Sequence, residues 1–198
     1  TIRRYQGLLI GRAVRATHLG DTKMASCQIH EALQWFDLVI SLVTHAYDES
    51  LRLFGSEETV FAQDLNFMLM LACTALWLGS PQLVQRANDW FLRYEKNGHL
   101  ADAGGDESVR KFVLWMLASK VSGIFQKPEV PLQDFGVYRA LAENGASHAE
   151  LVEEIEAVSD FHLYRSKEFP DADPSSSFYG EVLGLFPAEV FSFATLRS

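Results

Sequence analysis

Five carboxylates crowd one short stretch of the sequence, between residues 150 and 160. They are Glu150, Glu153, Glu154, Glu156 and Asp160. Carboxylate oxygens accept hydrogen bonds from Lys and Arg, so a dense group of them suits the binding of a cationic protein. An acidic helix can also occupy the phosphate-binding groove of a nuclease, because it offers oxygens to the same cations. Asp171 and Asp173 follow in the adjacent polar stretch and would extend such a surface.

The same stretch has the spacing of an amphipathic helix. Leu151, Ile155 and Val158 recur three and four residues apart, as on the inward face of a helix. The carboxylates would then point outward, and this segment contains no Lys or Arg before Arg165. A solubilising acidic face is the simpler interpretation. A docking surface for a cationic partner is the more specific one.

The other ionisable residues form no recognisable catalytic or metal-binding motif. The six histidines include no H-x-x-x-H, H-E-x-x-H or Glu-x-x-His arrangement, which would bring metal ligands to one helix face. No glycine-rich phosphate loop and no nucleophile elbow occurs. Cys27 and Cys73 lack a second ligand at metal spacing, and each fits an inert, buried thiol in an apolar helix. We therefore expect no enzymatic activity, no catalytic residue, no metal and no cofactor.

Length and composition indicate a single all-helical domain over residues 1–198. Of the 198 residues 48% are hydrophobic, with 17 Lys and Arg against 26 Asp and Glu. A chain of this length buries enough core to fold without a disulfide or a metal. No apolar run is long enough to span a membrane, and two isolated cysteines fit a reducing compartment. We expect a soluble, cytoplasmic protein with no membrane partner; a signal segment removed before Thr1 is an open alternative.

The charge is distributed unevenly along the chain. Residues 1–23 hold five basic residues and one acid, whereas residues 129–198 hold 13 acids and four basic residues. The acidic half would repel phosphate backbones, and no basic stripe occurs beyond the first predicted helix. We therefore expect no nucleic-acid partner. A basic protein is the natural complement of this chain.

Helical periodicity runs through nearly the whole sequence and predicts an all-α fold of about seven to nine helices. The expected helices cover residues 2–19, 22 to the stop at Gly55, 61–78, 81–96, 107–125, 132–143, 147–164 and a last segment from 187. Residues 61–78 are apolar on nearly all sides, as in a central, buried helix. We expect a compact stack of antiparallel helix pairs. A solenoid is the alternative, because the helix ends echo one another without a fixed period.

Aromatic and aliphatic side chains supply the expected core. All four tryptophans fall within predicted helices and are interpreted as core residues, with an aromatic ligand cage as the less favoured alternative. The final helix starts at Pro187. It is expected to bury Val190, Phe191, Phe193 and Leu196.

About the last 40 residues carry a resemblance to a known class of proteins. They contain Asp160-Phe161-His162-Leu163-Tyr164-Arg165, then Phe178-Tyr179, then Pro187-Ala188-Glu189-Val190. Together with the size, acidity and helical pattern, this ending resembles that of the all-helical immunity proteins that bacteria make against polymorphic or type VI-delivered toxins. The resemblance implies a cytoplasmic, non-catalytic protein that binds a cognate toxin tightly and occludes its active site or substrate groove.

Two hypotheses of different kinds follow. The first is an immunity protein, or antitoxin, that inhibits a cationic toxin, expected to be a basic nuclease domain, through the acids at 150–160 together with Asp171 and Asp173. The second is a helical-repeat adaptor or scaffold that binds a peptide or protein partner, with a concave face lined by Trp and Tyr as its sign. An enzyme with an unrecognised site between helices is a third, less favoured alternative. The sequence specifies neither the toxin nor the oligomeric state.

Overall fold

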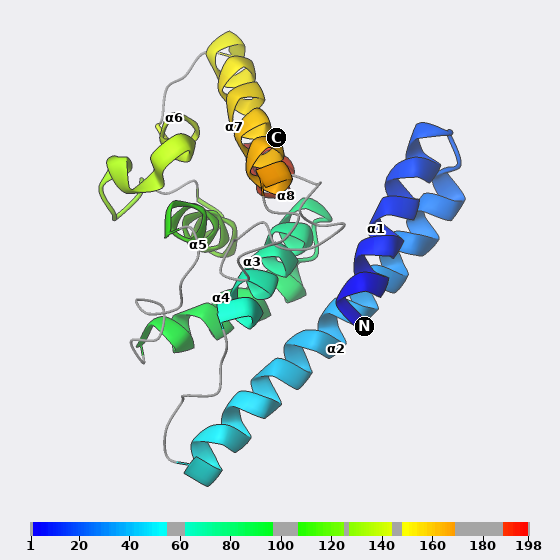
Figure 1. Ribbon diagram of the computed structural model, residues 1–198, viewed down its shortest axis with the longest axis vertical. Coiled ribbons are helices and arrows are strands. Elements are labelled where there is room, and N and C mark those ends of the chain that lie inside the picture. The colour runs from blue at the N-terminus through cyan, green and yellow to red at the C-terminus, as the bar shows by residue number, and fades with distance from the viewer. Residues whose placement is uncertain are drawn as a thin grey trace.

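The computed structural model describes residues 2–54, 62–96, 107–124, 127–143, 148–168 and 188–197. All regular structure within these ranges is helical, which confirms the all-α class and the predicted number of helices (Figure 1). In chain order the helices are α1 (Ile2–His18), α2 (Thr22–Phe54), α3 (Ala62–Trp77), α4 (Pro81–Lys96), α5 (Glu107–Ser122), the 3-10 helix η1 (Leu132–Tyr138), α6 (Arg139–Ala142), α7 (His148–Glu168) and α8 (Ala188–Arg197). Of the helices in these ranges, none combines the length and apolarity needed to cross a bilayer.

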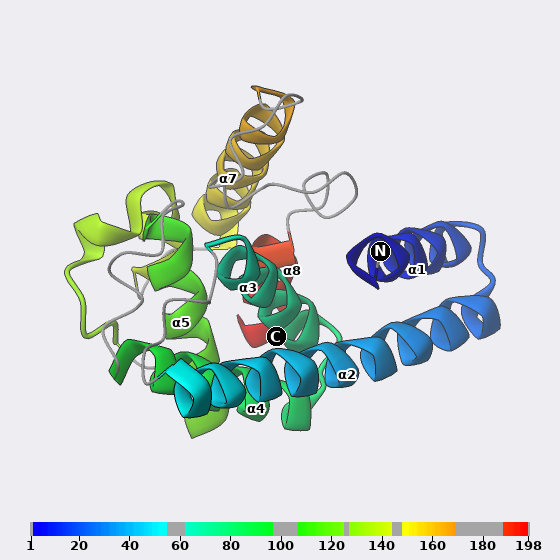
Figure 2. The same cartoon turned by 60° about the horizontal axis from the view of Figure 1, so that its bottom comes forward.

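Helices α1 and α2 form an antiparallel hairpin that projects from the other helices (Figures 1 and 2). The chain reverses at Gly20, whose φ of 76° costs a glycine little. The N–H of Asp21 donates to the Ala16 carbonyl at 2.9 Å, which closes the end of α1. Oδ1 of Asp21 accepts from the N–H of Met24 at 3.0 Å, which caps the start of α2. The break predicted between the helix at 2–19 and the helix that begins at residue 22 is therefore confirmed.

Helix α3 lies at the centre of the remaining helices and contacts α4, α5 and α8 (Figure 2). Its residues 71–76 are all buried, as predicted for a helix that is apolar on nearly all sides. Helix α5 contributes Phe112 and Trp115 to the same core. Helix α8 adds Phe193, whose ring centroid lies 5.8 Å from that of Phe112. The C-terminal helix thus completes a core built by the middle of the sequence.

The position of α8 distinguishes the two architectures that the sequence left open. In a solenoid each repeat contacts only its sequence neighbours. Here α8 packs along α3, and the Ser192 hydroxyl donates to the carbonyl of Cys73, 119 residues away in sequence. The fold is therefore a compact stack of helices.

The single helix expected over residues 132–143 is broken in two. Residues 132–138 form η1 and residues 139–142 form α6, and the helical path is broken within η1 at Gly136, whose φ of 51° and ψ of −123° lie outside the helical region. A Cβ atom at Gly136 would lie 3.1 Å from Cβ of Ser108 in α5. Hydrophobic periodicity did not indicate this break, since Phe135 and Tyr138 keep a helical spacing across it and are both buried.

The remaining helix boundaries lie close to the predicted ones, with one larger difference. Helix α7 runs to Glu168, whereas the sequence predicted its end near Tyr164. The predicted stop at Gly55 lies outside the described residues, as do residues 97–106, between the predicted helices at 81–96 and 107–125.

The inward face of α8 differs from the predicted one. Val190 and Phe193 are buried as expected, but Phe191 is exposed. Glu189 and Ser192 are buried instead. The prediction was wrong for Phe191 because consecutive helical residues point about 100° apart, and the direction that faces α3 is taken by residues 189, 190, 192 and 193.

Candidate partner-binding surface

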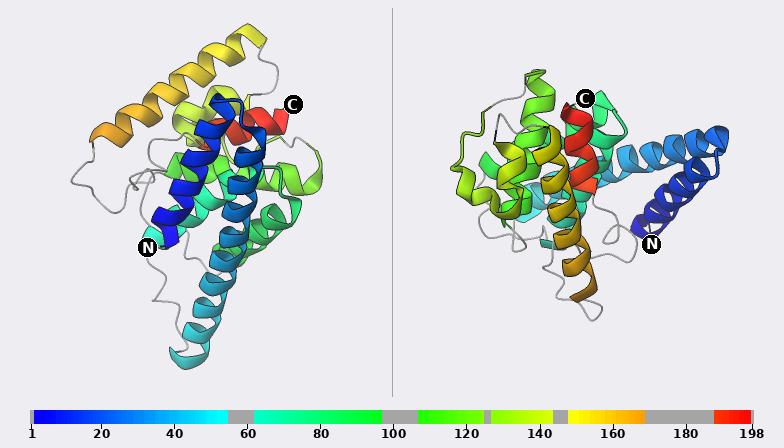
Figure 3. Two further views of the ribbon diagram at one scale, coloured as in Figure 1. Left: turned by 90° about the vertical axis from the view of Figure 1, so that its right-hand side faces the viewer. Right: turned by 90° about the horizontal axis from the view of Figure 1, so that it is seen from above.

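Helix α7, which carries the predicted binding residues, lies across α6, η1 and α8 at the surface of the molecule (Figure 3). Val158 of α7 is buried. Leu151, Ile155 and Phe161 are half-buried and pack against the core. The predicted inward stripe of Leu151, Ile155 and Val158 is therefore confirmed, and it fixes which side chains of α7 face solvent.

Three of the predicted acids form what we call the acidic stripe of α7: Glu153, Glu156 and Asp160. All three side chains are exposed, and their spacing of three and four residues places them on one helix face. At a rise of 1.5 Å per residue, the stripe extends along about 10 Å of helix. Among the side chains that the structure describes, no Lys or Arg forms an ion pair with any of these three carboxylates. The stripe therefore presents like charges to solvent.

The other predicted binding residues do not all join this stripe. Glu154 is half-buried, because it lies about 100° around the helix from Glu153, toward the side of Val158. Glu150 belongs to α7 by its backbone, but its side chain lies outside the described part of the chain. Asp171 and Asp173 also lie outside the described residues.

Several of the described Lys and Arg side chains form ion pairs with acids outside the acidic stripe. Nζ of Lys111 lies 2.9 Å from carboxylate oxygens of both Glu107 and Asp134. Its hydrogen bond lowers the pKa of Glu107, and the two carboxylates together raise the pKa of Lys111. Nε of Arg139 donates to Oε1 of Glu143 at 2.9 Å. These pairs join α5 to η1 and stabilise α6, and they leave the acidic stripe charged.

A second group of polar side chains lies inside the core, between α3, η1 and α8. The Tyr138 hydroxyl donates to Oε1 of Glu189 at 3.4 Å, and both residues are wholly buried. Burial raises the pKa of the neighbouring Cys73 thiol, and the charge of Glu189 raises it further. Because Tyr138, Glu189 and Cys73 are all buried, a substrate cannot reach this group unless the core opens. The sequence signal for Glu189 was its place in the first turn of a helix, where the macrodipole favours an acid.

The structure also locates the other residues that the sequence analysis considered for metal binding, for thiol chemistry or as an aromatic cage. Within the described ranges, no group of three or more His, Cys, Asp or Glu residues is arranged to hold a metal ion. Both cysteines are free thiols; Cys73 is buried as predicted, but Cys27 is exposed, so the prediction of a buried thiol was wrong for Cys27. Trp90 and Trp115 are buried, and the half-buried Trp35 and Trp77 pack against the same core, as predicted.

Comparisons with protein families, with curated proteins and with solved structures found no match. The role of each residue therefore has to be inferred from its own geometry and charge. The feature with the clearest consequence for binding is the acidic stripe, because it is exposed, carries one sign of charge and lies on a helix anchored by its opposite face.

Proposed function

We propose that this protein is an immunity protein that binds a cationic toxin domain and blocks its active site or substrate groove. We expect the toxin domain to be a nuclease. The observation that carries the proposal is the acidic stripe of α7, exposed and without an ion-pair partner among the described side chains. The resemblance of the C-terminal residues to helical immunity proteins supports the same conclusion. Glu150, Asp171 and Asp173 are proposed to extend the surface.

The proposed mechanism is occlusion assisted by electrostatic steering. Opposite charges on the two proteins speed diffusional encounter, and the carboxylates then accept charge-assisted hydrogen bonds from Lys and Arg of the toxin. Those Lys and Arg side chains would otherwise hold the phosphates of a nucleic acid. Val152, exposed next to the stripe on α7, is a suitable apolar anchor, since a few buried contacts usually determine the dissociation rate.

The cytoplasm is the proposed compartment. The two cysteines are free thiols in the structure, which suits a reducing environment. An immunity protein kept in the cytoplasm would meet a toxin that arrives there from a neighbouring cell.

The adaptor hypothesis has less support. An adaptor of this kind is expected to have a concave face lined by Trp and Tyr. In the described part of the chain, Trp90, Trp115 and Tyr138 are instead buried in the core.

The proposal is tested by capture followed by inhibition. The tagged protein is used to recover partners from its source organism at low and moderate salt, and eluted proteins are identified by mass spectrometry. We expect a basic protein that arrests growth when expressed alone and that is neutralised by co-expression of this chain. If the captured protein is a nuclease, stoichiometric addition of this chain should stop its cleavage of nucleic acid in vitro.

A matched pair of charge reversals shows whether α7 is responsible. Glu153→Lys with Glu156→Lys should abolish capture and neutralisation. Asp89→Lys with Glu129→Lys changes the net charge equally, at exposed acids on other parts of the surface, and should leave both unchanged. Equal loss in the two variants would reject α7 as the binding surface. A captured protein that is acidic, or that is bound without being inhibited, would reject the immunity function.

A further inference from the structure

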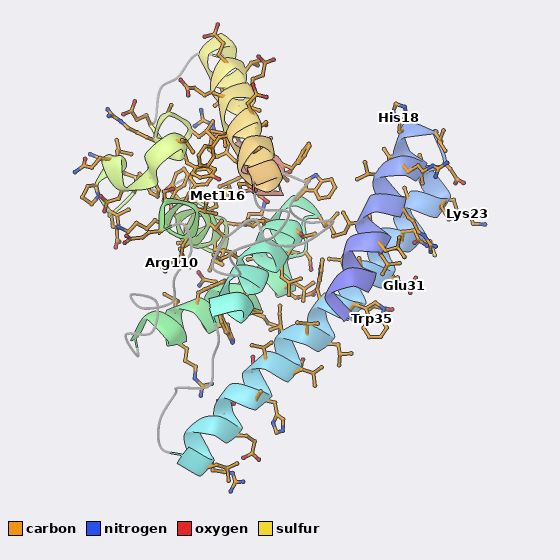
Figure 4. The ribbon with its side chains drawn as sticks, viewed as in Figure 1. His18, Lys23, Glu31, Trp35, Arg110 and Met116 are labelled. Atoms are coloured by element: carbon orange, nitrogen blue, oxygen red, sulfur yellow. The ribbon has the colours of Figure 1, made fainter. Side chains whose placement is uncertain are left out.

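The free end of the α1–α2 hairpin exposes two large apolar side chains. Leu19 in the turn and Met24 in the first turn of α2 have exposed fractions of 70 and 51%. Single exposed apolar residues are common on protein surfaces, but these two flank the same turn. This end projects away from the other helices (Figures 1 and 2), and His18 and Lys23 lie there in Figure 4. We call residues 12–24 the hairpin tip.

The hairpin tip is also basic. Arg12, Arg15 and Lys23 are exposed, and no acid among the described side chains forms an ion pair with any of them. Asp21 is the one acid in the sequence between residues 8 and 30. Its Oδ1 accepts the N–H of Met24 at the positive end of the α2 macrodipole, which offsets part of its charge. The tip therefore attracts anions.

This combination of side chains fits an anionic lipid surface better than other anions. Exposed aliphatic residues beside Arg and Lys match the interface of a bilayer, where the apolar groups enter the acyl boundary and the cations meet lipid phosphates. Nucleic-acid backbones are contacted through basic and polar groups, and bases stack on aromatic rings. Residues 8–30 contain no Phe, Tyr or Trp. A projecting tip also suits a broad surface, because it encloses no small ligand.

The negative charge of the rest of the chain lies too far from the hairpin tip to cancel this attraction. The formal net charge of the chain is −9. The ion pairs that join α2 to α4 begin at Asp37, about 20 Å along the helix from Lys23. Charges in solvent are largely screened beyond about 10 Å at 0.1 M salt. A surface that touches the tip therefore interacts mainly with the basic residues of the tip.

We propose that the hairpin tip docks on an anionic lipid surface, with Leu19 and Met24 inserted and the three basic residues on lipid phosphates. Arg12 precedes the end of α1 at His18 by about 9 Å, within the depth of about 5 to 10 Å that surface-bound helices reach. The sequence predicted no membrane partner because no apolar run could span a bilayer, but docking on a surface needs none. The proposal does not depend on the toxin, because the acidic stripe of α7 lies on a different part of the surface.

The first test is flotation of the full chain with vesicles in the absence of any toxin. We expect binding to vesicles of equal parts phosphatidylserine and phosphatidylcholine at low salt, and none to phosphatidylcholine alone. Arg15→Glu with Lys23→Glu should weaken binding at least about twentyfold, since each cation near such a surface contributes about fivefold. The control, Lys120→Glu with Lys127→Glu, changes the net charge equally at exposed residues outside the hairpin and should bind as the wild type does.

A second pair of substitutions separates a lipid surface from other anions. Leu19→Ser with Met24→Ser keeps every charge and, since both side chains are exposed, should keep the fold, which circular dichroism checks. It should weaken vesicle binding at least about tenfold, because two apolar side chains no longer leave water. If vesicles fail to bind while a nucleic acid binds both this variant and the wild type equally, the tip recognises phosphate backbones, and the lipid proposal is wrong.

The third test is the orientation of the bound protein, measured with an environment-sensitive fluorophore on single cysteines in a Cys27→Ser background. Cys73 is buried and stays unlabelled. A label at Thr22→Cys, in the hairpin tip, should shift to shorter wavelength when vesicles are added, whereas a label at Val152→Cys on α7 should not. Absence of vesicle binding, equal binding to neutral vesicles, equal loss in the lysine control, or a shift confined to residue 152 would each overturn the proposal.

Discussion

Lys111 is the residue that ties α5 to η1, because it contacts carboxylates of both elements. Its hydrogen bond lowers the pKa of Glu107, so the pair contributes its full stability above the ordinary titration range of a glutamate, and that contribution is lost as pH falls from this range through the lowered pKa. We expect Lys111→Met to reduce stability at neutral pH by about 0.5 kcal/mol, since the pair is largely exposed to solvent. The acid-side slope of stability against pH should become shallower. Urea unfolding between pH 3 and about 7 measures both.

Lys120 provides the control for this prediction, because it is exposed on the same helix and forms no ion pair among the described side chains. Lys120→Met should leave the acid-side slope as in the wild type. An equal change of slope in both variants would show that net charge, and not the bridge made by Lys111, controls stability at low pH.

The acidic stripe was predictable because its position depends on local spacing. Glu153, Glu156 and Asp160 are outward once Leu151 and Val158 face inward, and helical periodicity alone gives that result. The burial of Glu189 was not predictable in this way. It depends on Tyr138 and on the packing of α8 against α3, which join parts of the chain distant in sequence.

Replacement by alanine is expected to change the stability of the fold in opposite directions at two glycines in helical segments. Gly136 has a φ of 51°, and an added Cβ would lie 3.1 Å from Ser108. Gly136→Ala should therefore lower stability by about 1 to 3 kcal/mol, mainly because a residue with a Cβ atom rarely adopts this φ together with a ψ of −123°. Gly11 lies inside α1 with open space around it. Gly11→Ala should raise stability by about 0.5 to 1 kcal/mol, the gain usual for this replacement in a helix.

Thermal and urea unfolding of the two glycine variants give the comparison directly. If Gly11→Ala lowers stability, α1 requires a glycine at this position and the space around residue 11 is not open. A neutral Gly136→Ala would mean that the backbone at residue 136 can change to a conformation that alanine adopts at no cost.

Helix ends were predicted wherever the signal was local. The hydrogen bonds that close α1 at Gly20 recur at Gly79, where the Ser80 N–H donates to the Ala75 carbonyl at 3.0 Å. Both glycines have positive φ, and each directly follows a predicted helix end, at residues 19 and 78. The break at Gly136 was missed because the buried residues on its two sides, Phe135 and Tyr138, keep a helical spacing. Helix ends with a glycine beyond the apolar pattern are thus visible in a sequence, whereas a break that leaves the pattern intact is not.

At the scale of the whole molecule, the uneven charge of the sequence becomes a separation in space. Arg12, Arg15 and Lys23 are exposed on the α1–α2 hairpin, with Lys23 near its tip in Figure 4. The acidic stripe lies on α7, on a different part of the surface. A cationic partner approaching this molecule is therefore attracted toward α7 and repelled from the hairpin tip. This arrangement orients an encounter before any contact forms.

The orienting effect should appear in the rate of association with the captured cationic protein. We expect the association rate, measured by stopped-flow fluorescence, to fall steeply between low and physiological salt, because screening shortens the range of the attraction. Glu153→Gln with Glu156→Gln should lower the rate at low salt several-fold and flatten its salt dependence. The control, Asp89→Asn with Glu129→Asn, should change the slope less, because those acids lie outside the acidic stripe. An association rate that does not respond to salt would mean that shape alone brings the two proteins together.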